Sequence, residues 1–175
     1  MSQTVAIIGA GPLGRSLALR AARAGFRVLL EDVMPSNLHH AQEYIRRELN
    51  PDALAGVAFV STVEDAVRSA DLVIDCVPDE LESKLEILWL LDRMSPPQTV
   101  FATPTTNLSI ADLAACTYRA GQCVAIAAEP AALMEPSTAN VELRGTTATT
   151  PETRALLQHF WTALGLSCNF REEQA

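Results

Sequence analysis

The chain has 175 residues, 49 % of them hydrophobic, and a formal net charge of −8 at pH 7. This length and composition predict one domain with an apolar core and exclude a disordered chain. The acidic balance argues against non-specific nucleic-acid binding, which needs a positive surface. Charged residues interrupt the apolar stretches well before the roughly 18 residues that a membrane span requires. We therefore expect neither a nucleic acid nor a membrane as a partner.

Cysteine usage and the first residues bear on the cellular compartment. No two cysteines have Cys-x-x-Cys spacing; they are Cys76, Cys116, Cys123 and Cys168. Buried free thiols in a reducing compartment are therefore favoured over disulfides or zinc, and no metal site is expected. The stretch from Met1 to Gln3 contains no basic region followed by an apolar one, so no secretory signal is expected. These features together predict a cytoplasmic protein.

Strand and helix patterns alternate along the chain. The first apolar run is Val5–Ile8, and a helical pattern follows from Pro12 to Ala24. Further strands are expected at Arg27–Glu31, Val57–Val60, Leu72–Val77, Thr99–Ala102, Cys123–Ala128 and Val141–Arg144, with Leu166–Phe170 as a final strand or tail. Further helices are expected from a Ser36 cap to about Leu49, over Val63–Ser69, from Asp79 or Glu80 to Met94, after a Ser109 cap, and from a Thr150 cap to Gly165. The segment from Glu129 to Thr138 is expected to be a loop.

This alternation predicts an α/β fold, namely a single domain with a Rossmann-type, doubly wound and mostly parallel sheet. The almost continuous apolar run Leu72–Val77 is typical of a parallel strand that is covered on both faces. We expect the domain to occupy residues 1–170 and residues 171–175 to form a frayed tail.

The glycine pattern Gly9-x-Gly11-x-x-Gly14 lies between the first predicted strand and the first predicted helix. In such a loop the first glycine permits a tight turn, the second lets the backbone approach a pyrophosphate, and the third lets helix and strand pack closely. The next strand ends in the acidic pair Glu31-Asp32, at the distance expected of a carboxylate that binds a ribose. The alternative is a glycine turn that binds nothing.

We take Asp32 as the ribose carboxylate, because strand alternation places Glu31 one step away from that position. A carboxylate there would repel the 2′-phosphate of NADP, so the predicted cofactor is NAD. Pro12 and Leu13, at the start of the first helix, are included with the three glycines among the predicted cofactor-binding residues.

Four segments of the chain, together covering much of its middle and end, resemble the NAD-binding domain of the L-3-hydroxyacyl-CoA dehydrogenases. The resemblance runs from about Val5 to Cys168. Its motifs are Ser69–Leu88, where a strand ends in an acidic loop and a lysine follows; Thr99–Ile110, similar to the family's Ser-Asn-Thr-Ser-Ser-Leu-x-Ile; Val141-Glu142-Leu143, similar to Val-Glu-Val; and Thr149–Thr153.

The resemblance implies roles for residues beyond the glycine loop. Val77 and Asp79 would lie near the nicotinamide half of the cofactor, and Lys84 stands where the family has a cofactor-contacting lysine. Thr106 stands where the family has a substrate-contacting serine, and Glu142 where it has the glutamate that orients the catalytic histidine. Pro104 replaces an asparagine of the motif, so one amide group is lost there.

The family's catalytic histidine is missing. Where the family has a His-Phe-Phe-Asn-Pro-like segment, this chain has Ala127-Ala128-Glu129-Pro130. Alanine cannot take the proton of a hydroxyl group, and the loss of a general base typically costs about 10²- to 10⁴-fold in rate. Glu129 is the nearest alternative base; the other interpretation is a solvated loop residue.

Two further segments of the family have no counterpart in these 175 residues: a helical hairpin after the second strand and a second, all-helical domain. The chain is therefore either a fragment or a stand-alone domain. We therefore predict an NAD(H)-binding domain of the oxidoreductase type that is impaired in the family's His/Glu chemistry. The alternative is a non-catalytic NAD(H)-sensing or interaction subunit. A partner chain is one way to supply the missing domain. A homodimer is also expected, because the predicted last helix and Val141–Leu143 would otherwise expose an apolar patch.

Overall fold

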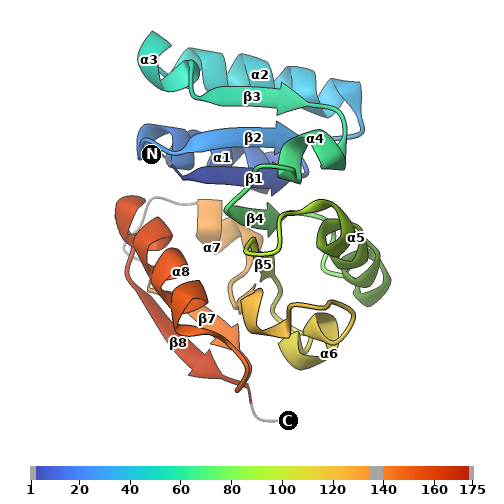
Figure 1. Ribbon diagram of the computed structural model, residues 1–175. Coiled ribbons are helices and arrows are strands. Elements are labelled where there is room, and N and C mark those ends of the chain that lie inside the picture. The colour runs from blue at the N-terminus through green and yellow to red at the C-terminus, as the bar shows by residue number, and fades with distance from the viewer. Residues whose placement is uncertain (1–2, 135–139, 174–175) are drawn as a thin grey trace.

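Eight strands form one sheet in the order β3-β2-β1-β4-β5-β6-β7-β8 within residues 3–134 and 140–173, which the computed structural model describes (Figure 1). The strands are β1 (Thr4–Ile8), β2 (Arg27–Glu31), β3 (Val57–Val60), β4 (Leu72–Asp75), β5 (Val100–Pro104), β6 (Cys123–Ile126), β7 (Val141–Gly145) and β8 (Cys168–Glu172). The first six strands are parallel, whereas β7 pairs antiparallel with β6 and parallel with β8. The predicted α/β class with a mostly parallel sheet is confirmed.

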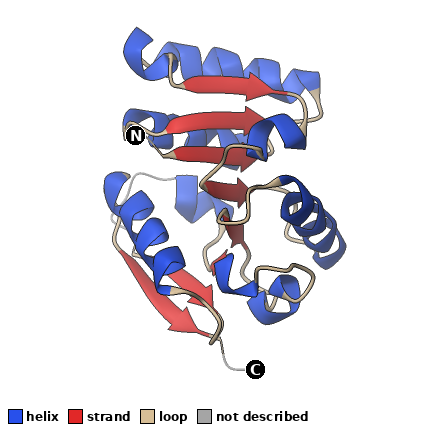
Figure 2. Ribbon diagram, viewed as in Figure 1, coloured by secondary structure: helices blue, strands red, loops and turns tan. Residues whose placement is uncertain are grey.

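Helices cover both faces of this sheet (Figure 2). They are α1 (Pro12–Arg23), α2 (Pro35–Glu48), α3 (Pro51–Leu54), α4 (Val63–Val67), α5 (Leu81–Met94), α6 (Ile110–Ala114), α7 (Pro130–Met134) and α8 (Pro151–Ala163), with a 3-10 turn at Ala120–Gln122. One apolar cluster joins the sheet to α1, α2, α7 and α8, and a second joins it to α4, α5 and α6. Neighbouring residues of one strand serve different faces: Ile7 belongs to the first cluster and Ile8 to the second.

The strand order reverses between β1 and β4. The backbone N–H of Cys76 donates to the Ile8 carbonyl at 2.7 Å, which holds the two strands together at their carboxyl ends. In doubly wound sheets, ligands bind outside the carboxyl ends of the strands at this reversal. The fold therefore directs attention to the loops that follow β1, β2 and β4.

Two helix boundaries near β2 differ from the prediction. Ser36 does not cap α2: this helix begins at Pro35, after Met34, and no side chain caps it. Proline at the first position needs no capping acceptor because it lacks an N–H group. Asn50, the residue after the predicted end of that helix, caps a further short helix, α3, by accepting a 2.9 Å hydrogen bond from Ala53 N–H.

The segment predicted as a loop at Glu129 to Thr138 contains a helix, α7. Leu133 of α7 is buried in the first apolar cluster, and its carbonyl accepts a 3.0 Å hydrogen bond from Arg20 Nη1 of α1. Packing against α1 therefore stabilises a helix that is too short for sequence periodicity to reveal. Residues 135–138 of the predicted loop lie outside the described residues.

The last strand extends past the boundary expected at residue 170. β8 ends at Glu172, and Glu173 N–H donates to the Gly145 carbonyl at 2.8 Å. The Glu173 carboxylate also accepts hydrogen bonds from Ser109 Oγ at 2.5 Å and from Ile110 N–H at 3.1 Å. Pairing with β7 thus orders residues 171–173, where a frayed tail was expected, because backbone partners are available there.

The apolar patch expected on the last helix and β7 does not exist in the structure. Five of its large apolar side chains are between 0 % and 2 % exposed, namely Val141, Leu143, Leu157, Phe160 and Trp161, and Leu156 and Leu164 are partly buried. They pack into the first apolar cluster, together with α1 and the neighbouring strands. The stated reason for a homodimer at this surface is therefore wrong.

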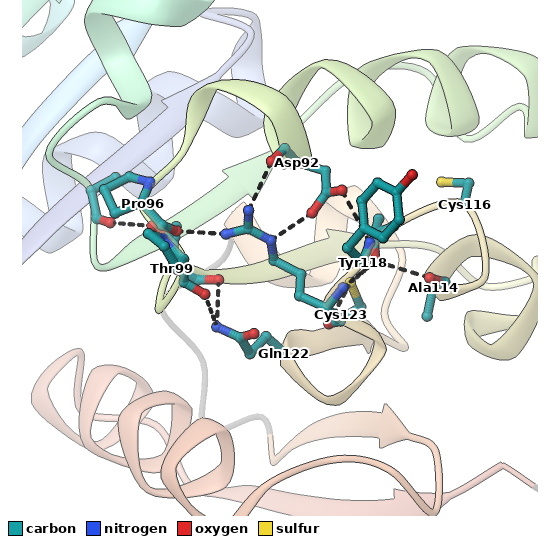
Figure 3. Close-up of polar contacts among 12 residues, drawn as sticks. Asp92, Pro96, Thr99, Ala114, Cys116, Tyr118, Gln122 and Cys123 are labelled. Carbon is teal, nitrogen blue, oxygen red and sulfur yellow. Dashed lines mark hydrogen bonds and ion pairs between the residues drawn. The ribbon is translucent and has the colours of Figure 1, made fainter.

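A buried ion pair closes the opposite, amino-terminal end of the sheet. Arg119 Nε donates to Asp92 Oδ1 at 2.6 Å, and its other nitrogens donate to the carbonyls of Pro96 and Asp92 (Figure 3). Gln122 donates to the carbonyls of Pro97 and Thr99 in the same cluster. These contacts join the end of α5 to the segment before β6, far in the chain from the glycine loop.

None of the helices in the described part of the chain is both long and apolar enough to cross a membrane.

Candidate functional site

The glycine loop between β1 and α1 has the geometry that its sequence predicts. Gly9 has a positive φ of 99°, which L-residues with a side chain rarely adopt. A Cβ atom at Gly14 would lie 1.7 Å from the Gly9 carbonyl oxygen, so only glycine fits there. A Cβ atom at Gly11 would meet no atom within 4 Å and would point into open space. The loop therefore leaves room at Gly11 for a group that approaches the backbone closely.

The start of α1 faces this open space. Gly11 is the N-cap, and Pro12 occupies the first turn without an N–H group of its own. The first N–H groups of a helix have no partner inside the helix, and the helix dipole gives this end a partial positive charge. The start of α1 can therefore bind the phosphates of a dinucleotide.

Asp32 joins the end of β2 to the glycine loop. Its Oδ2 accepts hydrogen bonds from Ala10 N–H at 2.8 Å and from Asn37 Nδ2 at 3.0 Å, and its Oδ1 accepts one from Met34 N–H at 2.8 Å. A carboxylate has about four acceptor positions, so one remains for a ribose hydroxyl. The predicted ribose ligand thus has a structural role as well.

A cavity of about 520 Å³ lies beside the glycine loop at the carboxyl ends of β1, β2 and β4. Gly9, Gly11 and Asp32 line it together with Val77, as the prediction of a common site requires. On the side of α4 and α5 it is lined by the apolar Val63, Ile87 and Leu90 and by the polar Ser83 and Glu86. The cavity therefore extends from the glycine loop to the helices α4 and α5.

Glu31 also lines this cavity, although sequence reasoning set it aside in favour of Asp32. The residue is 2 % exposed, and Oε1 has no hydrogen-bond partner among the described residues. Burial, together with the negative charge of Asp32, raises the pKa of Glu31 to about 7. The sequence feature that could have identified Glu31 is an acidic residue at an inward-facing position of a buried strand.

A second, smaller cavity of about 240 Å³ lies between the ends of β4, β5 and β6. Leu13, Val77 and Asp79 line it, with Ala128 on the β6 side. Thr106 N–H donates to Asp79 Oδ2 at 3.1 Å, so the structure brings together two residues predicted to belong to one site. Thr105 also lines the cavity and is buried.

No imidazole lies near this second cavity. Of the three histidines in the chain, His39 and His40 are on the exposed surface of α2, and His159 of α8 packs edge-on against Phe26. The residues that follow β6, Ala127 and Ala128, carry no titratable group. The next residue, Glu129, is exposed at the start of α7.

Glu142 is paired with a different cation. Its carboxylate lies 3.1 Å from Arg171 Nε, while its backbone carbonyl accepts a 2.8 Å hydrogen bond from Ala127 N–H. Ala127 belongs to the segment that stands where the family has its catalytic histidine. It is therefore a neighbour of Glu142, as the resemblance implies, but only the two backbones interact. Arg171, on β8, was not among the predicted residues.

Lys84 is fully buried beneath the site. Its Nζ lies 2.6 Å from Asp75 Oδ1, and both side chains are 1 % exposed. Burial raises the pKa of Asp75, and the charge of Lys84 opposes that shift. Lys84 is not among the residues that line either cavity, so the structure places it behind the end of β4.

Cys76 lines both cavities but is a poor nucleophile. Burial, reinforced by the charge of Asp75, raises the pKa of its thiol far above the ordinary value. The thiolate is the reactive form, so Cys76 supplies apolar surface to the site rather than chemistry.

Comparison with known proteins identifies the family of this chain. The 3-hydroxyacyl-CoA dehydrogenase, NAD binding domain family model matches residues 4–168. A probable 3-hydroxybutyryl-CoA dehydrogenase of Bacillus subtilis is 32 % identical over 128 residues, which are 66 % of this chain and 44 % of that protein. The 3-hydroxyadipyl-CoA dehydrogenase of Escherichia coli is 35 % identical over 125 residues, covering 65 % of this chain and 26 % of that protein. The chain thus spans less than half the length of these curated relatives.

Solved structures agree on the fold. A diketoreductase structure superposes with a TM-score of 0.84 at 28 % identity, over 99 % of this chain and 66 % of that one. The (S)-3-hydroxybutyryl-CoA dehydrogenase PaaH1 of Ralstonia eutropha gives a TM-score of 0.87 at 24 % identity, over 99 % of this chain and 65 % of that one. The glycine loop, the acidic end of β2, the sheet order and the matched length lead to one conclusion: the chain belongs to the 3-hydroxyacyl-CoA dehydrogenase family and forms its NAD-binding domain.

Proposed function

We propose that this chain binds NAD(H) across the carboxyl edge of the sheet but cannot carry out dehydrogenation by a histidine–glutamate route. The adenosine half would occupy the larger cavity, with Asp32 at the ribose and the start of α1 at the pyrophosphate. The nicotinamide half would occupy the smaller cavity, against Leu13, Val77 and Asp79. When bound, NAD supplies a hydride acceptor; the chain supplies binding and orientation.

The observation that carries this proposal is the chemistry at the end of β6. Hydride removal from a hydroxyl carbon requires a group that takes the hydroxyl proton within hydrogen-bond reach. Ala127 and Ala128 offer none, and the Glu142 carboxylate is paired with Arg171. Thr106 retains a hydroxyl that would hydrogen-bond a small ligand there, but a threonine hydroxyl is no base near neutral pH.

Lys84 supports the cofactor site from behind. Its ion pair with Asp75 fixes the end of β4, from which Val77 and Asp79 extend into the smaller cavity. A direct contact between Lys84 and the cofactor would require the ammonium group to leave Asp75, which would then be a buried, unpaired carboxylate.

Binding and turnover can be tested separately. NADH is titrated against the wild type and against Gly11→Val, with fluorescence and thermal unfolding as readouts. Ligand at 100 times its Kd should stabilise the wild type by about 2.7 kcal/mol. Because a Cβ atom at Gly11 would meet no atom within 4 Å, the variant should fold normally and lose binding. If the variant binds NADH as tightly as the wild type, the glycine loop is not the cofactor site.

Turnover is then measured with 3-hydroxybutyryl-CoA, the substrate class named for the Bacillus relative, at saturating NAD. We expect a rate at least about 10²-fold below that of an ordinary dehydrogenase, the usual cost of a missing general base. A comparable rate would mean that another group, with Glu129 as the first to test by Glu129→Gln, acts as the base.

The alternative function is a non-catalytic NAD(H)-sensing or interaction subunit. The Glu142–Arg171 ion pair favours it, because it occupies the carboxylate that would otherwise orient a base. The two functions are separated by measuring turnover and association in the presence of a partner chain that completes the site. Turnover that appears only with the partner supports the oxidoreductase. Association that depends on NADH and gives no turnover supports the sensor.

Self-association and compartment are further parts of the proposal. Trp89 and Tyr118 are 50 % and 102 % exposed and line one surface cavity, which supports a homodimer through α5 and the segment after α6, in place of the buried α8 surface. Sedimentation velocity at high concentration, with Trp89→Glu as the control, tests this.

The free state of all four cysteines supports a reducing compartment such as the cytoplasm.

A further inference from the structure

Glu31 occupies a place in the larger cavity that differs from that of Asp32. It is the last residue of β2 and lies in register between Ile8 of β1 and Val60 of β3. Ile8 and Val60 belong to the apolar cluster on the α4 and α5 face, whereas Asp32 contacts Ala10 and Asn37 on the side of the glycine loop and α2. The two adjacent carboxylates therefore face different parts of the cavity.

Glu31 lacks a hydrogen-bond donor. Oε1 is buried without a partner in the described part of the chain, and no lysine, arginine or histidine is among the residues that line the cavity. The other acidic residues that line it are Asp32 and the exposed Glu86. A buried acceptor that stays unpaired is destabilising, so a bound ligand that donates a hydrogen bond here gains a contact that the empty protein lacks.

The surroundings of Glu31 suit a flat heterocycle. The ribose and pyrophosphate belong near Asp32 and the glycine loop, because the donors and the free acceptor position lie there. Besides the polar Ser83 and the exposed Glu86, the α4 and α5 residues that line the cavity are Val63, Ile87 and Leu90, which offer apolar surface. On a dinucleotide placed in this way, the group that reaches beyond the ribose is the adenine base.

We infer that Glu31 recognises the adenine base of the cofactor by accepting a hydrogen bond from the exocyclic amine of that base. This inference rests on the proposed cofactor site and adds a base-specificity residue to it. No lysine, arginine or histidine lines the cavity to compete with the ligand for the Glu31 carboxyl group. Either ionisation state retains an oxygen that accepts from the amine.

The test compares NADH with reduced nicotinamide hypoxanthine dinucleotide, in which a carbonyl oxygen replaces the amine. At a pH well above 7, where Glu31 is ionised, an acceptor would then face an acceptor at Glu31, so the wild type should bind the hypoxanthine dinucleotide about 10-fold or more weakly. In Glu31→Gln the side chain has nearly the same shape and can turn an amide N–H toward the carbonyl, so the ratio of the two Kd values should fall to near 1. Glu31→Leu should weaken NADH and also lose the discrimination.

Glu86→Gln is the matched control, because it removes a carboxylate that lines the same cavity but is exposed. Its Kd ratio should equal that of the wild type, and thermal unfolding checks that every variant folds. If wild type and Glu31→Gln discriminate equally, or if Glu31→Gln weakens both dinucleotides by the same factor, Glu31 does not read the base. If neither dinucleotide binds the wild type, the proposed cofactor site fails together with this inference; if both bind equally, only this inference fails.

Discussion

The Asp32 carboxylate accepts a 2.8 Å hydrogen bond from the Ala10 backbone N–H, so the residue expected at the ribose also holds the glycine loop against β2. The two residues are 22 positions apart in the chain. A change at Asp32 therefore affects both cofactor selection and the conformation of the loop, and experiments on this residue need a control that separates the two.

Asp32→Ala should reduce the discrimination between NADH and NADPH, because the carboxylate that repels the 2′-phosphate is gone. The same change removes three hydrogen bonds and should lower the free energy of unfolding by about 1–3 kcal/mol. Fluorescence titrations with both cofactors give the discrimination, and urea unfolding gives the stability. Asn37→Ala is the control: it removes one donor to Asp32 but keeps the carboxylate, so the NADH to NADPH ratio should stay at the wild-type value. An unchanged ratio in Asp32→Ala would show that Asp32 does not meet the ribose.

Gly14→Ala should abolish folding or distort the loop severely, since its Cβ would lie 1.7 Å from the Gly9 carbonyl oxygen, which is backbone and cannot move aside. Gly25→Ala offers a comparison, because no atom lies within 4 Å of its Cβ although its φ is 88°, and it should cost only about 1 kcal/mol. Expression level and thermal unfolding measure both. A Gly14→Ala protein as stable as the wild type would show that α1 can shift away from β1.

Glu31 should make stability depend on pH in a predictable direction. Its pKa rises from 4.5 to about 7 on folding, so the folded state holds an extra proton between these values. Stability from this group is highest below pH 4.5 and falls as pH increases to about 7, by up to about 3 kcal/mol. The free energy of unfolding of wild type and Glu31→Gln is compared at pH 5 and pH 8. The variant should gain relative to the wild type at pH 8, and a difference that is the same at both pH values would contradict the shifted pKa.

Arg119→Ala should destabilise the fold strongly. The Arg119 and Asp92 side chains are 10 % and 5 % exposed, so the variant leaves a buried carboxylate without its cation and should lose about 3–5 kcal/mol. Arg23→Ala is the matched control, because its ion pair with Glu48 has side chains that are 50 % and 47 % exposed and should contribute at most about 1 kcal/mol. Urea unfolding of the two variants gives the comparison. Equal losses would mean that burial does not strengthen the Arg119 pair. NADH affinity should be preserved in both, since neither arginine lines the two cavities at the cofactor edge.

Local patterns predicted most elements of this fold because each depends on a few neighbouring residues. The apolar run of β1 and the glycine spacing after it identify a strand, a turn and a helix without any distant partner. The short helix α7 was missed because its stability comes from packing on α1, and the end of β8 was placed too early because its partner is β7.

The sequence by itself determined the alternation of strands and helices, the phosphate-binding loop and the acidic end of β2, since turn geometry and apolar periodicity are local properties. Only the tertiary structure decided the partner of each charged group: Lys84 with Asp75, Glu142 with Arg171, and Glu31 with none among the described residues. It also buried the α8 surface that was expected to be exposed. The physical reason is that ion pairing and burial depend on which strands become neighbours in the sheet, and that order brings together residues far apart in the chain.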